Sequence, residues 1–234
     1  MQFQTPLIPA NLKKRYKRFL ADCILDNGQQ ITAHCPNPGS MIGLAEPNTR
    51  IWLEPNYNPK KKLKFGWRLV EHLNGHFTGV DTTIPNRILR HALEAHSIPQ
   101  LNQYDSVQPE IKVNKGSRID FLLTAKKQPN TYIEVKSVTL MRQKGMAEFP
   151  DAVTERGTRH LQELERISNQ GHRAILFFLV QRTDCRHLTI ADDIDQIYAH
   201  TLKQAQTAGV EILAYGSQIN SKEITLGTKI DFIN

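Results

Sequence analysis

The stretch from Ser117 to Val138 places three charged side chains inside two otherwise apolar strands. In the first strand, apolar residues at 119, 121 and 123 face one way and Asp120 faces the other. After a polar turn, the second strand carries Glu134 and Lys136 on one face. Paired as a hairpin, the strands bring the three charges onto one face. Burial of such charges is costly unless they pair with each other or bind a ligand.

A further carboxylate comes from the strand expected over residues 107–113, whose polar face carries Glu110. Carboxylates from neighbouring strands can hold Mg²⁺ or Mn²⁺, with water and phosphate oxygens completing the shell. We expect Asp120, Glu134 and Glu110 to be the metal ligands. We expect Asp120, Glu134 and Lys136 to be the catalytic set, in which the lysine orients the attacking water or stabilises the transition state.

Thirteen residues separate Asp120 from Glu134, and Glu134 begins the pattern Glu-x-Lys. PD-(D/E)XK nucleases require this spacing, with Glu-x-Lys on the strand after the Asp. The spacing alone also fits an ordinary Glu–Lys pair across an exposed sheet. The apolar flanks of both acidic residues and the order of the surrounding elements favour the metal site. Asp151 follows Pro150 but comes after the Glu-x-Lys segment, so we interpret it as a helix cap.

The sequence pattern changes near residue 82. Residues 1–82 contain five short strand signals, two pairs of them around Asn-Gly turns, which predicts a small barrel of the oligonucleotide-binding (OB) type. Residues 83–234 predict the order α-β-β-β-α-β-α-β, a mixed sheet flanked by helices. The run at residues 174–180 is apolar throughout, as in a strand covered on both faces. The expected fold is therefore mixed α/β, an OB-like barrel followed by a PD-(D/E)XK nuclease-like domain.

The formal net charge is +7, and the excess lies mainly in residues 1–84, with 11 Lys and Arg against 6 Asp and Glu. Two stretches mix basic and aromatic residues, 13–19 and 60–67. Cations replace the counterions of a nucleic-acid backbone and rings stack on bases; a solvated loop is the alternative. We expect DNA contacts from Lys13, Arg15, Lys17, Arg18, Lys60, Lys61, Lys62 and Lys64.

A helix is expected from Asp151 to about Asn169, with one apolar stripe that includes Val153 and His160. Arg156 and Arg159 lie on the flank of this stripe, where they could line the rim of the site and contact DNA. Ordinary surface charge explains them equally well. His160 lies on the buried stripe, which favours a core histidine over a catalytic one.

The composition excludes several protein classes. The three cysteines match no zinc or redox spacing, and no apolar run approaches about 18 residues, so we expect a soluble cytoplasmic protein without a membrane segment. No motif for a small-molecule cofactor is recognisable. The sequence leaves the oligomeric state open, with a homodimer among the options.

Several segments together resemble the sugar fermentation stimulation protein family of bacteria and archaea. The resemblance covers nearly the whole chain, and its matching segments are residues 15–22, 34–41, 117–121, 132–140 and 149–157. Pro38 and Asp81 depart from the family pattern, where Thr and Asn are expected.

The resemblance implies an OB-type barrel, a PD-(D/E)XK-like domain, DNA binding with little sequence preference, and a role in regulating sugar (maltose) utilisation. It leaves two hypotheses open: a protein that acts by binding DNA, or an active Mg²⁺-dependent nuclease. A regulator that binds a small sugar-like molecule is a weaker third, because no sugar pocket is recognisable in the sequence.

Overall fold

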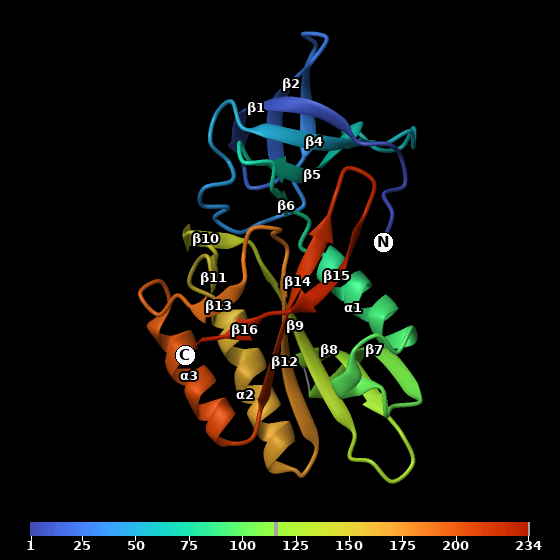
Figure 1. Ribbon diagram of the computed structural model, residues 1–234, viewed down its shortest axis with the longest axis vertical. Coiled ribbons are helices and arrows are strands. Elements are labelled where there is room, and N and C mark those ends of the chain that lie inside the picture. The colour runs from blue at the N-terminus through green and yellow to red at the C-terminus, as the bar shows by residue number, and fades with distance from the viewer. Residues whose placement is uncertain (115–116, 234) are drawn as a thin grey trace.

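The computed structural model describes residues 1–114 and 117–233, and its first strands form a β-barrel above an α/β domain (Figure 1). The barrel strands follow the order β3-β2-β1-β4-β5, and a pairing of His34 with Gly66 joins β3 to β5 and closes it. β6 extends the sheet beyond β5. The strands are β1 (Ile8–Tyr16), β2 (Leu20–Leu25), β3 (Gln30–His34), β4 (Arg50–Pro55), β5 (Phe65–Glu71) and β6 (Phe77–Gly79).

β1 is the barrel strand that the sequence pattern did not indicate. Its alternation is interrupted by Lys13 and Lys14, and a bulge between Leu12 and Lys14 shifts its pairing with β2. Leu12 remains buried in the barrel core, together with Ala10. The first basic stretch is therefore half strand and half turn, because β1 ends at Tyr16 and the turn follows at once.

The second domain is a six-stranded sheet with helices on both faces, ordered β15-β14-β12-β9-β8-β7. β9, β12 and β14 run parallel, and the remaining pairings in this sheet are antiparallel. Its strands are β7 (Ser106–Asn114), β8 (Ser117–Thr124), β9 (Thr131–Val138), β12 (Arg173–Val180), β14 (Glu211–Ile219) and β15 (Ile224–Lys229).

The helices divide the core in two. α1 (Ile84–Glu94) packs on one face of the sheet, where Phe121, Ile133 and Phe177 are buried. α2 (Glu155–Asn169) and α3 (Gln196–Thr207) pack on the other face against a second buried cluster. β12 lies between the two layers and is buried along residues 174–180, as predicted for a strand covered on both faces.

Together, the barrel and the α/β domain confirm the fold class expected from the sequence. Some details differ. The expected loop at residues 139–149 is a hairpin, β10 (Leu140–Gln143) and β11 (Met146–Phe149), which turns at Gly145 with φ +81°. This hairpin joins a small second sheet with β13 (His187–Ile190) and β16 (Asp231–Phe232). A short 3-10 helix spans Pro99–Leu101.

The start of α2 also differs from the expectation. Its N-cap is Thr154, whose side chain accepts a hydrogen bond from the Gly157 N–H at 3.0 Å. Asp151 lies before the helix and bonds to the barrel instead: its carboxylate accepts from Ser40 Oγ at 3.1 Å and from the Met41 N–H at 3.3 Å. Val153 is 70% exposed and is not part of the buried stripe. Asp151 is therefore a contact between the domains rather than a helix cap.

The two domains are joined by backbone pairing as well as side chains. Gly79 N–H donates to the Gln181 carbonyl at 2.8 Å, and Thr183 N–H donates to the Phe77 carbonyl at 3.1 Å. The β14–β15 hairpin reaches up to the barrel beside the N-terminus in Figure 1, where Ile224 N–H donates to the Met1 carbonyl. No helix in the described part of the chain is long and apolar enough to cross a membrane.

Candidate metal and nucleic-acid site

Asp120 lies where β8 and β9 separate. The backbones of the two strands pair from Leu123–Thr131 to Phe121–Ile133. Beyond that point the Asp120 side chain, rather than the β8 backbone, accepts a hydrogen bond from β9. Asp120 Oδ2 accepts from the Val135 N–H at 2.8 Å, and Oδ1 accepts from Asn86 Nδ2 of α1 at 2.7 Å. Both carboxylate oxygens therefore have fixed positions at the opening between the strands.

Ile119 shows how the chain bends here. We expected it to share a face with Phe121 and Leu123, which was wrong: it packs in the core under α2 and α3, whereas they pack in the core under α1. The alternation breaks at Asp120, where pairing with β9 has ended while β8 stays paired with β7 through Ile119 and Phe121.

Glu134 forms a compact cluster with Lys136 and His160. Its side chain is only 3% exposed, Oε1 accepts from Lys136 Nζ at 2.7 Å, and the same oxygen contacts His160 Nδ1. Lys136 Nζ also lies 3.0 Å from His160 Nδ1. The sequence placed His160 on the buried stripe of α2, which is correct, but its contacts are with the charged cluster rather than with an apolar core.

The surroundings shift the pKa values of Asp120 and Glu134 in opposite directions. Burial, followed by the Glu134 charge, raises the pKa of Asp120. Burial also acts to raise the pKa of Glu134, but Lys136 and His160 outweigh it and lower that pKa. The two carboxylates repel each other in a buried place, as the raised pKa of Asp120 indicates, and a bound cation would offset this repulsion.

A divalent cation fits the donor groups present. Glu134 Oε2 is buried and has no hydrogen-bond partner within residues 1–114 and 117–233. Two carboxylates with water and phosphate oxygens form an ordinary Mg²⁺ environment. The described residues hold no group of three or more His, Cys, Asp or Glu side chains placed to bind a metal. Any ion here would therefore take its other ligands from solvent, backbone or substrate.

Glu110 does not join this pair, contrary to the expectation. Its side chain is 75% exposed and lies 3.4 Å from Arg118. The backbone at Glu110 has φ +54°, so the strand twists locally and turns the side chain outward. Strand parity alone could not show this twist.

Two neighbours of the cluster were not identified from the sequence. Asn86 was an unremarkable helix residue, and no signal marked it. Tyr198 of α3 is fully buried, and its hydroxyl has no hydrogen-bond partner within the described ranges. Burial, then the charges of Glu134 and Asp195, raise the pKa of Tyr198 well above its ordinary value. The cluster is therefore assembled from both layers of helices.

The arginines of α2 differ in their contacts. Arg156 Nε lies 3.4 Å from His160 Nε2, so it stands beside the cluster while remaining exposed. Arg159 lies 3.8 Å from Glu155, one turn earlier. Arg156 is thus the one of these two that lies beside the charged cluster.

Two family models match the two domains. One, described as the SfsA N-terminal OB domain, matches residues 14–80. The other, described as the sugar fermentation stimulation protein RE domain, matches residues 83–223, more than half of the chain. The chain belongs to the sugar fermentation stimulation protein family.

Relatives in this family match along nearly their whole length. A sugar fermentation stimulation protein homolog from Ruegeria sp. is 61% identical over 227 residues, covering 97% of this chain and 98% of the relative. A homolog from Pseudoalteromonas atlantica is 47% identical and covers all of both chains. A structure of Pyrococcus furiosus SfsA in complex with Ca²⁺ superposes with a TM-score of 0.90 at 26% identity, covering 100% of this chain and 98% of that one.

In this family member, the two basic stretches of the barrel meet around His34. Phe19, at the end of the first stretch, stacks on His34 with ring centroids 6.4 Å apart and an interplanar angle of 13°. Lys61, from the second stretch, lines the same pocket as His34 and lowers its pKa, after the larger effects of burial and Arg68. Residues more than 40 positions apart therefore share one surface.

The predicted DNA-contacting side chains divide into exposed and structural ones. Lys13, Lys17, Arg18, Lys60, Lys61, Lys62 and Lys64 are exposed. Arg15 is half-buried, and its guanidinium donates to the carbonyls of Asn37 and Gly39 at 2.8 and 2.9 Å. Lys64 Nζ donates to the Asn58 carbonyl at 3.1 Å, so it helps to shape its own loop. The side chains of Arg15 and Lys64 therefore donate hydrogen bonds to carbonyl groups of the barrel domain itself.

The loop between β3 and β4 docks the barrel onto the second domain. Gly39 N–H donates to Asn37 Oδ1 at 2.8 Å, and Ser40 Oγ donates to the Asp151 carbonyl at 2.7 Å. With the Met41 N–H directed to Asp151 as well, these groups are engaged within the protein. The donor groups of this loop therefore already have partners within the protein.

Proposed function

We propose that this protein binds DNA with little sequence preference through its barrel, and that this binding serves the regulation of sugar (maltose) utilisation. The observation that supports DNA binding is the convergence of the two basic stretches at His34. Exposed lysines and arginines on one surface release counterions from a phosphate backbone without reading bases, which gives affinity without sequence preference. The family name supports the link to sugar use.

We further propose that Asp120 and Glu134 hold a divalent cation, Mg²⁺ or Mn²⁺. The support is the buried, unpartnered Glu134 Oε2 next to a second carboxylate whose two oxygens are fixed by Val135 and Asn86. The Pyrococcus furiosus relative was solved with Ca²⁺, an ion that prefers the same oxygen ligands.

Metal-dependent cleavage of DNA phosphodiester bonds is the second candidate function, and the Lys136 ammonium favours it. A bound divalent cation would supply Lewis acidity and a more acidic water. Lys136, held 2.7 Å from Glu134, is placed to orient an attacking water or to stabilise negative charge on the phosphoryl oxygens. His160 contacts both Glu134 and Lys136 and so fixes their positions. Arg156, beside His160, can receive a neighbouring phosphate.

The deciding experiment incubates the purified protein with plasmid, single-stranded and branched DNA, with Mg²⁺ or Mn²⁺ and with EDTA. Binding is read by a gel shift and cleavage by product length. We expect salt-sensitive binding to all three substrates. Cleavage that is lost in Asp120→Ala and Lys136→Ala while binding remains would establish the nuclease. Binding without cleavage on all three substrates would reject cleavage for them, and affinity that does not change with salt would reject the basic-surface argument.

A further inference from the structure

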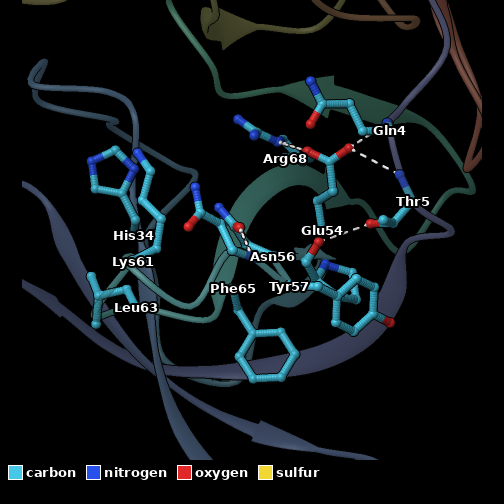
Figure 2. Close-up of a pocket in the computed structure, with 13 residues that line it drawn as sticks. Gln4, Thr5, His34, Glu54, Asn56, Tyr57, Lys61, Leu63, Phe65 and Arg68 are labelled. Carbon is cyan, nitrogen blue, oxygen red and sulfur yellow. Dashed lines mark hydrogen bonds and ion pairs between the residues drawn. The ribbon is translucent and has the colours of Figure 1, made fainter.

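A pocket of about 530 Å³ opens beside the barrel where the two basic stretches meet (Figure 2). Sites for small molecules typically measure about 300–1,000 Å³. The β4–β5 loop, the end of β3 and the N-terminal segment form its walls. In Figure 2, His34 and Lys61 stand along one side, Tyr57 and Thr5 on the opposite side, and Phe65 at one end.

The β4–β5 loop that lines the pocket is held in place by hydrogen bonds between its own residues. Asn56 Oδ1 accepts from the Asn58 N–H and Asn58 Oδ1 accepts from the Lys60 N–H, both at 2.9 Å. Asn56 N–H donates across the loop to the Lys64 carbonyl at 2.7 Å. Because loop N–H groups occupy the carboxamide oxygens, Asn56 and Asn58 can offer their NH₂ groups to a ligand.

Aromatic rings are exposed at this place. Among the described residues, the strongly exposed large apolar side chains include two aromatic rings, Tyr57 at 81% and Phe19 at 46%. Tyr57 lines the pocket, and Phe19 stacks on His34, which lines it too. The faces of such rings are what unpaired nucleobases stack on.

The positive charge in the pocket comes from Lys61. Arg68 also lines the pocket, but Glu54 accepts from its Nε at 2.8 Å and Asp81 contacts its other end, so two carboxylates more than offset its single positive charge. Burial and the nearby Arg68 lower the pKa of His34, so its ring is mostly neutral at pH 7. Lys61 is exposed, beside His34, and placed to meet a phosphate.

We propose that this pocket holds one unpaired nucleotide of a single-stranded DNA segment, with its base against Tyr57 and its phosphate at Lys61. The inference rests on the DNA binding proposed above and makes it more specific. A blunt duplex keeps its bases stacked inside the helix and cannot place one against a ring without an unpairing cost. The pocket therefore gives the protein a preference for single strands and frayed ends over intact duplex.

Binding of three fluorescent or competing probes tests the proposal: a single-stranded 12-mer, a blunt duplex of the same sequence, and a free nucleoside monophosphate. The variants are Tyr57→Ala with Tyr57→Phe as its ring-preserving control, and Lys61→Ala with Lys60→Ala as its control. Lys60 is exposed in the same loop but does not line the pocket. Tyr57 and Lys61 are exposed, so these variants should fold, and far-ultraviolet circular dichroism checks that they do.

We expect Tyr57→Ala to weaken single-strand binding by roughly 5- to 150-fold and to leave duplex binding within about 2-fold, since stacking contributes about 1–3 kcal/mol per base. Tyr57→Phe should bind as wild type, and Lys61→Ala should lose more single-strand affinity than Lys60→Ala. Competition by the monophosphate would show that the pocket also accepts a free nucleotide; its absence would show that a DNA chain is required.

Two results would overturn the proposal and can be told apart. If both DNA probes bind and Tyr57→Ala weakens them equally, or weakens neither, the pocket inference fails while DNA binding stands. If neither DNA probe binds the wild-type protein at low salt, the proposed function fails, and the pocket inference fails with it.

Discussion

Asp120 Oδ2 accepts the backbone N–H of Val135 at 2.8 Å, although their strands have already stopped pairing at that point. The carboxylate replaces the missing backbone acceptor and is thereby held next to Glu134, the residue before Val135. A gap in a sheet thus becomes a rigid site with two acidic groups. The arrangement raises the pKa of Asp120, through burial and the Glu134 charge, and so favours a cation that would relieve the repulsion.

Metal addition should stabilise the protein through this pair. With Mg²⁺ or Mn²⁺ at about 100 times its dissociation constant, the wild-type protein gains about 2.7 kcal/mol. Asp120→Ala and Glu134→Ala should lose this gain because each removes one carboxylate ligand. Differential scanning fluorimetry with and without metal measures the shift.

Glu110→Ala is the matched control for the metal test. It removes a carboxylate that is 75% exposed and directed towards Arg118, so the metal shift should persist. A shift that survives in Asp120→Ala, or that disappears in Glu110→Ala, would place the ion elsewhere.

Neutralising the exposed lysines of the β4–β5 loop should weaken DNA binding without reducing stability. Changing Lys60, Lys61 and Lys62 together to Ala should reduce the slope of log affinity against log salt by up to about 2.7, because each phosphate that a lysine neutralises adds about 0.9 to that slope. A salt titration by fluorescence anisotropy gives the slope. An unchanged slope would show that this loop does not meet the phosphate backbone.

Arg15→Ala should behave differently, because Arg15 donates to the Asn37 and Gly39 carbonyls. We expect a decrease of about 1–3 kcal/mol in unfolding free energy, since the variant removes hydrogen bonds from a charged donor. Chemical denaturation measures it, and Lys13→Ala is the control because Lys13 is exposed on the same strand. Equal stability of the two variants would contradict the structural role.

The buried pair of Arg182 and Asp184 should make stability depend on pH. Burial acts to raise the pKa of Asp184, but the Arg182 guanidinium, which donates to both carboxylate oxygens at 2.7–2.8 Å, lowers it below 3.8. A lowered carboxyl pKa contributes stability above about pH 4 that is lost as the pH falls through the folded-state value. Asp184→Asn should therefore cost about 3–5 kcal/mol at pH 7.

The pH dependence separates this electrostatic effect from a packing effect. The difference between wild type and Asp184→Asn should shrink as the pH falls below about 4, because the unfolded carboxyl then takes up a proton, whereas the folded one stays ionised until the pH passes its lowered pKa. Urea denaturation of metal-free protein at pH 7 and at pH 3–4 measures both values. A difference that stays constant would show that packing, not charge, explains the destabilisation.

Gly39→Ala should disturb the contact between the domains. A Cβ atom at this position would lie 2.6 Å from Asp151 Oδ2, closer than any real contact. We expect a cost of about 1–3 kcal/mol from overpacking, measured by thermal denaturation. Ser40→Ala removes the hydroxyl that donates to the carbonyl and the carboxylate of Asp151, without adding bulk, and should cost less, about 1 kcal/mol. A Gly39→Ala variant as stable as wild type would show that the loop shifts freely.

Most of the fold could be predicted from the pattern of hydrophobic residues. The continuous apolar run at residues 174–180 identified the central strand, because only a strand covered on both faces needs no polar side. β1 was not predicted, because its bulge and its lysines break the alternation that marks a strand. The hairpin at residues 140–149 was not predicted either, because both of its strands are only four residues long, which is too short for a periodic signal.

The sequence by itself determined which charges lie in apolar strands, and so it made Asp120, Glu134 and Lys136 the candidate site residues. Only the tertiary structure decided what surrounds them. Glu110 turns outward at a local backbone twist, whereas Asn86, His160 and Tyr198 come to the site from three helices. Periodicity reports the face on which a residue lies within its own element, but contacts between elements depend on where each strand stops pairing and how the helices pack on the sheet.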